Sequence, residues 1–96
     1  MLHLIFQSPV EVATLDRMDV GDVAVFFENA IFRLLRAGDL NGLLTEQLKT
    51  NRFCVLSDDL AVRGIAQDEL INGLDIIDYA ELVSLTVDNA VIQTWT

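Results

Sequence analysis

The sequence contains few of the residues from which disulfide and metal sites are built. Cys54 is the one cysteine and His3 the one histidine among 96 residues. A lone cysteine cannot form a disulfide within the chain, and no cysteines or histidines are paired at metal-ligand spacing. We therefore expect no structural disulfide and no metal site.

Long hydrophobic runs and a basic leader are also missing. A membrane-spanning helix needs about 20 consecutive apolar residues, and no stretch of the sequence approaches that length. Met1–Phe6 lacks both the basic residues and the apolar length of a signal peptide. We expect a cytoplasmic protein that makes no contact with a membrane.

Basic residues are scarce. The chain has 6 Lys and Arg against 15 Asp and Glu, for a net charge of -9. Such a surface repels phosphate backbones, so direct binding to nucleic acid is not expected. None of the 5 glycines lies in a phosphate-binding pattern such as G-x-G-x-x-G, and no cofactor is predicted. The acidic excess is larger in residues 51–96, which we take as the face for a basic partner.

Apolar residues, in contrast, are abundant. They make up 52% of the chain, and the mean hydropathy is +0.41, which excludes intrinsic disorder. A chain of 96 residues forms one domain, residues 1–96. Because a domain this small leaves many side chains at its surface, we expect part of the apolar excess to lie in subunit contacts.

Short apolar runs alternate with helical patterns along the chain. The runs are continuous, as in strands buried on both faces, which indicates a three-layer α/β/α sandwich with a mainly parallel sheet. The run at 23–27 is expected at its centre. Predicted strands span 2–6, 23–27, 53–56 and 74–77, with an edge strand at 91–95; predicted helices span 12–18, 30–37, 40–48, 57–63 and the segment after Asp78.

Polar residues follow each predicted strand, where open parallel sheets bind ligands. Helix capping is the favoured interpretation of these positions, because each has local backbone groups to satisfy. Asp78 with Glu81 resembles a capping box for a helix with Tyr79, Leu82, Val83 and Thr86 on one face. The strand-end positions are Gln7, Ser8, Glu28, Asn29, Ser57, Asp58 and Asp78.

Four further residues carry chemistry that could be functional. Cys54 is the weak candidate for a catalytic nucleophile, but its place inside a strand favours a buried structural thiol. His3 also lies in a strand, so a histidine satisfied in the fold or at an interface is favoured over a catalytic base. Arg63 ends a helix, where a cation interacts well with the helix dipole. Trp95 is either a lid on the core or an anchor in a partner's pocket.

These elements, taken in order, resemble the TusB/DsrH family over essentially the whole chain. The resemblance is carried by Met1-Leu2-His3, Ser8-Pro9, Gly21-Asp22, Asp59-Leu60 with Arg63-Gly64, Ile77-Asp78-Tyr79, Val83 with Leu85-Thr86, and Gln93 with Trp95. It implies a DsrE-like fold and a subunit of a heterohexamer that relays persulfide sulfur. Its partners would be TusC/DsrF-like and TusD/DsrE-like subunits, with a TusE/DsrC-like acceptor receiving the sulfur.

The resemblance implies two family roles, namely 2-thiolation of the tRNA wobble uridine in the Tus branch and sulfur oxidation in the Dsr branch. The relay cysteine belongs to the D subunit, and the cysteine that some DsrH members carry in the first helix is absent from 12–18. We expect a non-catalytic subunit; a sulfurtransferase that uses Cys54 and a small-ligand-binding module are the alternatives. Candidate partner contacts are His3, Ser57, Asp58, Arg63, Tyr79 and Trp95.

Overall fold

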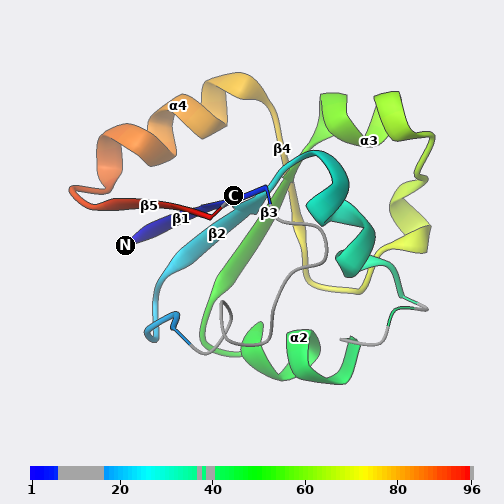
Figure 1. The fold of residues 1–96 in the computed structure, drawn as a ribbon, viewed down its shortest axis with the longest axis horizontal. Helices are drawn as coiled ribbons and strands as arrows, with labels where there is room; N and C mark the ends of the chain where they lie inside the picture. The colour runs from blue at the N-terminus through cyan, green and yellow to red at the C-terminus, as the bar shows by residue number, and fades with distance from the viewer. Residues whose placement is uncertain (7–16, 37, 39–40, 96) are drawn as a thin grey trace.

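The computed structural model describes residues 1–6, 17–36, 38 and 41–95. Five parallel strands form one sheet in the order β4-β3-β2-β1-β5 (Figure 1). The strands are β1 (Leu2–Ile5), β2 (Val23–Phe26), β3 (Arg52–Leu56), β4 (Asp75–Ile77) and β5 (Ile92–Trp95). All five predicted strands are confirmed, with β2 at the centre of the sheet as expected.

Helices cover both faces of the sheet, which confirms the three-layer α/β fold class. The chain steps from β1 to β4 in one direction and then returns across the sheet to β5. Because crossovers between parallel strands are right-handed, the return places its helix on the opposite face. Figure 1 shows α4 on the other side of the sheet from α2. The helical elements are η1 (Glu28–Leu34), α2 (Asn41–Gln47), α3 (Ser57–Arg63), η2 (Gln67–Glu69) and α4 (Tyr79–Asp88).

Two apolar clusters fill the spaces on the two sides of the sheet. The larger contains Phe26 and Phe53, whose rings meet edge to face at 5.5 Å. The smaller lies beneath α4 and contains Val25, Cys54 and Leu85. Alternate residues of each strand enter different clusters, as the twofold repeat of a strand requires. This explains why the strands read as continuous apolar runs.

Three local predictions differ from the structure or lie outside it. The helix predicted at 30–37 is instead the 3₁₀ segment η1, in which Ala30, Ile31 and Leu34 are fully buried. Its β-branched and aromatic residues favour an α-helix only weakly, so packing against the sheet decides the conformation. The helix at 12–18 and the positions Gln7 and Ser8 fall largely or wholly outside the described residues.

Tyr79, Leu82, Val83 and Thr86 share one face of α4, as predicted, but only the Leu82 edge of this face packs against the core. Leu82 and Leu85 face the sheet and belong to or pack against the cluster beneath the helix. Tyr79 and Val83 are 57% and 59% exposed on the outer side. The sequence pattern is ambiguous because apolar residues occupy both sides of this helix, and only packing selects the buried one.

Candidate functional site

The carboxyl ends of β2 and β3 are joined by a carboxylate. Glu28, the first residue of η1 and two residues after the end of β2, has a left-handed φ of 52°. Its backbone N–H donates to Oδ2 of Asp59 at 3.2 Å. Asp59 lies in the first turn of α3, and its Oδ1 is 3.8 Å from the Arg63 guanidinium. The Asp59 side chain therefore fixes the start of α3 against the exit of β2, a role that the sequence did not suggest.

Ser57 and Asp58 do not cap α3, contrary to the prediction. Leu56 occupies the N-cap position and makes no side-chain hydrogen bond, while Ser57 and Asp58 lie exposed within the first turn. A carboxylate here favours the helix dipole without capping the helix. The prediction is confirmed for Asp78, whose Oδ1 accepts a hydrogen bond from the Glu81 backbone at 2.8 Å. Strand-end polar residues thus have different roles at the two helices.

Arg63 stands at the predicted end of α3, where Gly64 adopts a left-handed φ of 65° and terminates the helix. The Arg63 guanidinium lies toward Asp59 one turn earlier. Its Nε is buried and has no hydrogen-bond partner among the described residues. Arg63 and Asp59 are both largely buried, with 19% of each side chain exposed, so the pair ties the two ends of α3 together.

His3 and Trp95, two of the candidates, meet on the sheet face that also carries the larger cluster. Nε2 of the buried His3 is 2.9 Å from Oδ2 of Asp22, and the indole Nε1 of Trp95 lies 3.1 Å from Nδ1 of His3. Arg17 sits over the indole ring at 5.9 Å. Because an indole N–H can only donate, Nδ1 of His3 must accept this hydrogen bond. The ring proton of His3 is then on Nε2, and Nε2–H donates a hydrogen bond to Asp22.

This network resembles a catalytic histidine and carboxylate, but both ring nitrogens of His3 are already engaged in hydrogen bonds. The nitrogen that could act as a base, Nδ1, is occupied by Trp95. The chain's only thiol, Cys54, belongs to the cluster on the other face of the sheet. His3 is therefore satisfied within the fold, and Trp95 serves at least partly as a lid on its own domain. Asp22 was missed at the sequence level, where Gly21-Asp22 reads only as a polar turn before a strand.

Cys54 lies in β3 under α4 and is fully buried. Burial raises the pKa of the thiol to about 11; Arg52 lowers it by a smaller amount, while Asp75 and Glu81 raise it further. A sulfur nucleophile needs a thiolate, and at pH 7 a thiol with this pKa is ionised to only about one part in ten thousand. Neither the access nor the electrostatics of Cys54 suits sulfur transfer.

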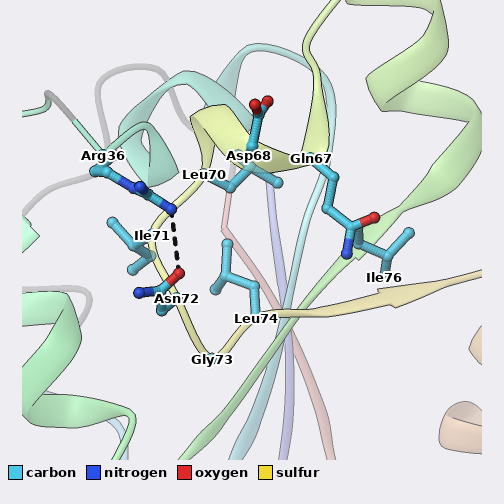
Figure 2. Close-up of a pocket in the computed structure, with 9 residues that line it drawn as sticks. All are labelled: Arg36, Gln67, Asp68, Leu70, Ile71, Asn72, Gly73, Leu74 and Ile76. Carbon is cyan, nitrogen blue, oxygen red and sulfur yellow. Dashed lines mark hydrogen bonds between the residues drawn. The ribbon is translucent and has the colours of Figure 1, made fainter.

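A cavity of about 470 Å³ lies beside the start of β4 (Figure 2). Its apolar lining comes from Leu70, Ile71, Leu74 and Ile76, and Arg36 Nη2 donates to Asn72 Oδ1 at 3.1 Å across its rim. The remaining lining residues are Gln67, Asp68 and Gly73. No thiol, hydroxyl or imidazole is among these residues, whose charged groups are the Arg36 guanidinium and the Asp68 carboxylate.

The candidate contacts therefore fall in three separate places. His3 and Trp95 share one network, Ser57, Asp58 and Arg63 lie on α3, and Tyr79 is exposed at the start of α4. Within the described part of the chain, no group of three His, Cys, Asp or Glu side chains is placed to hold a metal ion. No helix in those same residues is long and apolar enough to cross a membrane.

These features define a small α/β domain with an all-parallel sheet and a sealed thiol. The DsrH-like protein family model matches residues 7–92, so the chain belongs to this family. It is 32% identical to Protein TusB of Pectobacterium parmentieri over 99% of this chain and 100% of that protein.

Two solved structures share the fold. A Methanobacterium thermoautotrophicum protein of unknown function, MTH1491, superposes with a TM-score of 0.73 at 20% identity, covering 97% of this chain and 95% of that one. The ychN protein of E. coli gives a TM-score of 0.75 at 16% identity, covering 98% of this chain and 97% of that one. At such identities the likeness establishes the fold alone.

Proposed function

We propose that this chain is a non-catalytic subunit of a cytoplasmic heterohexamer of the TusBCD type, with two copies each of three related chains. The complex receives persulfide sulfur through TusA from a cysteine desulfurase. It delivers that sulfur to a TusE-like acceptor for 2-thiolation of the tRNA wobble uridine. The full-length similarity to a TusB protein supports this branch of the family.

The observation that carries the non-catalytic role is the state of the only cysteine. In a persulfide relay, an acceptor thiolate attacks the outer sulfur of a donor persulfide; the donor leaves as a thiolate and the acceptor becomes the persulfide. Cys54 is fully buried, and its pKa is raised to about 11. The relay cysteine therefore has to come from a partner, which we assign to the TusD-like chain.

In a second branch of the family, a subunit with the same structural role would belong to a complex that serves a different pathway. In a DsrEFH-type complex the chain would serve sulfur oxidation, and the match to the DsrH-like family model supports this alternative. The two branches share the assembly and differ in the fate of the sulfur. Loss of 2-thiouridine from tRNA after deletion of the gene would favour the Tus branch over the Dsr branch.

The proposed assembly is tested by native mass spectrometry of this chain co-expressed with TusC-like and TusD-like chains and exposed to a persulfide donor. We expect a hexamer with two copies of each chain and one added sulfur on the TusD-like chain only. A chain that stays monomeric beside both partners, or a sulfur label on Cys54, would overturn the proposal. Cys54→Ala serves as the control for labelling.

A further inference from the structure

The only histidine and the only tryptophan of the sequence are hydrogen-bond partners across two neighbouring strands. β5 is an edge strand, and it lies beside β1 with His3 opposite Gln93 and Ile5 opposite Trp95 (Figure 1). His3 and Trp95 are thus offset by two residues on the same face of the sheet. Besides the backbone pairing, the bond from Nε1 of Trp95 to Nδ1 of His3 attaches the end of β5 to a buried side chain.

This bond exists in only one protonation state of His3. A neutral imidazole has one N–H donor and one acceptor, whereas an imidazolium has two donors and no acceptor. The indole N–H of Trp95 is a donor in every state. When His3 takes up a second proton, its new Nδ1–H therefore faces the indole Nε1–H, and the hydrogen bond between the two rings is lost.

The other half of the network keeps its hydrogen bond after protonation. Nε2–H of His3 donates to Oδ2 of Asp22, 2.9 Å away, whether the ring is neutral or charged, and the carboxylate favours the charged ring. The amino terminus lies 3.0 Å from Oδ1 of the same carboxylate and opposes a further positive charge. Asp19, whose side chain is exposed, donates its backbone N–H to Asp22. The cost of protonation therefore falls on the contact with Trp95.

Charge and space on the Trp95 side of the imidazole both favour movement of the indole. Arg17 lies over the indole ring, 5.9 Å from its centroid, and its positive charge opposes an imidazolium beneath that ring. β1 and its two neighbouring strands, β2 and β5, contain no charged side chain. A hollow of about 240 Å³ adjoins the pair; its lining residues are Met1, His3, Arg17, Gln93 and Trp95.

The hollow also provides an acceptor for the new Nδ1–H. His3 is only 2% exposed, and a buried donor without a partner is unfavourable. Gln93 lies opposite His3 in the register and lines the same hollow, so its amide oxygen and entering water are the acceptors within reach once the indole has moved.

We propose that His3 is a pH-sensitive switch that anchors the indole of Trp95 while the imidazole is neutral and releases it when the imidazole is protonated. In the released state the bond from His3 to Asp22 remains, and the indole N–H at the end of β5 faces solvent. The switch goes beyond the proposed function, because it concerns contacts within this chain and does not depend on a partner.

Nuclear magnetic resonance can follow both partners, because the chain has one histidine and one tryptophan. The full-length chain, labelled with ¹⁵N in these two residue types, is titrated from pH 8 to pH 5, the range in which histidine side chains ordinarily change charge. At pH 8 the ring nitrogen shifts should place the proton on Nε2. As His3 is protonated, solvent exchange of the indole N–H, relative to free tryptophan at the same pH, should accelerate about tenfold.

Three results of this titration would overturn the switch. They are a proton on Nδ1 at pH 8, an imidazole that stays neutral down to pH 5, and an indole whose protection is unchanged while His3 is protonated. None of them affects the proposed function, since the switch plays no part in the assembly. When the labelled chain is assembled with unlabelled partners, the signals still come from this subunit alone.

Because the coupling is reciprocal, removing the indole must change how His3 binds its proton. In Trp95→Phe no donor opposes Nδ1–H, so the affinity of His3 for its second proton should rise about tenfold. Thr94→Ala is the matched control, because this exposed neighbour in β5 points to the other face of the sheet and should leave that affinity unchanged. Equal proton affinity in wild type and Trp95→Phe would overturn the switch.

His3→Asn separates His3 from every other titrating group. The amide oxygen of asparagine replaces Nδ1 as an acceptor and is not protonated in this pH range. Indole exchange relative to free tryptophan should therefore be the same at pH 8 and pH 5. Acceleration in His3→Asn equal to that in the wild type would assign the change to another group and overturn the switch. Circular dichroism establishes that the variant folds; if it does not, the wild-type titration and Trp95→Phe decide.

Discussion

The indole of Trp95 and the imidazole of His3 are joined across adjacent parallel strands by a 3.1 Å hydrogen bond from Nε1 to Nδ1. This bond attaches the last described residue of the edge strand β5 to the buried strand β1. It also fixes the tautomer of His3, so that its Nε2–H donates to Asp22. A residue pair near opposite ends of the sequence thus joins β5 to β1 and leaves the only histidine without a free basic nitrogen.

Replacing Trp95 with phenylalanine should destabilise the fold. A smaller aromatic ring replaces the indole, and Nδ1 of the buried His3 loses its donor; loss of this hydrogen bond costs about 1 kcal/mol of the free energy of unfolding. Urea unfolding followed by circular dichroism measures the change. Tyr79→Phe is the control, because the tyrosine is exposed and should alter stability by less than about 0.5 kcal/mol. Equal stability of wild type and Trp95→Phe would show that this hydrogen bond contributes nothing.

Asp22 predicts how stability depends on pH. Burial alone would raise the pKa of its carboxyl, but hydrogen bonds from His3, the amino terminus and the Asp19 backbone outweigh burial and lower the pKa below its ordinary 3.8. A carboxyl with a lowered folded-state pKa stabilises the fold above its unfolded value, and this stabilisation is lost as the pH falls through the folded value.

Asp22→Asn should therefore reduce stability by about 1–3 kcal/mol near pH 7. The difference in unfolding free energy between wild type and variant should shrink below about pH 4, where the wild-type carboxylate becomes protonated. Urea titrations at a series of pH values measure this difference. A difference that is constant from pH 7 to pH 2 would contradict a charged Asp22 in the fold.

Cys54 should be inert in the native protein. A thiol reagent such as a chromogenic disulfide is expected to react with it only after unfolding, because the side chain is fully buried. Cys54→Ala should cost less stability than Cys54→Ser, since serine buries a hydroxyl with no partner, a penalty of about 1–3 kcal/mol. Rapid labelling of the native chain, at the rate of a free thiol, would contradict the sealed position.

The left-handed backbone of Glu28 predicts an unusual order of substitutions. At φ 52°, Glu28→Gly should be more stable than Glu28→Ala by about 1 kcal/mol, because a Cβ disfavours this conformation. Ser84, exposed in the middle of α4, is the matched control. There the alanine variant should exceed the glycine variant by about 1 kcal/mol. The same order at both positions would contradict the left-handed conformation at Glu28.

The fold could be predicted from the sequence because its strands are buried on both faces. Val23–Phe26 and Arg52–Leu56 alternate between two apolar clusters, so most of their positions must be apolar. The end of α3 at Gly64 and the start of α4 at Asp78 could also be predicted, because each depends on a contact within a few residues. The 3₁₀ conformation of η1 could not be predicted, because it depends on packing against the sheet.

Contacts between distant residues could not be predicted. Asp59 binds the backbone of Glu28 across 31 residues, and Asp22 binds His3 across 19. Neither spacing carries a local signature, because strand order and register decide which residues meet. Neither Asp59 nor Asp22 is therefore among the candidate residues predicted from the sequence. The inward side of α4 was uncertain for a related reason, since both of its sides are apolar.

The central claim is that this subunit is needed for sulfur transfer but does not carry sulfur. The most direct test is to delete the gene in its host, restore either the wild-type chain or Cys54→Ala, and quantify 2-thiouridine at the tRNA wobble position by mass spectrometry. The two chains should restore the modification equally, while the empty vector does not. If Cys54→Ala accumulates and assembles as the wild type does yet leaves tRNA without the thiolated uridine, the subunit carries sulfur and the account is wrong.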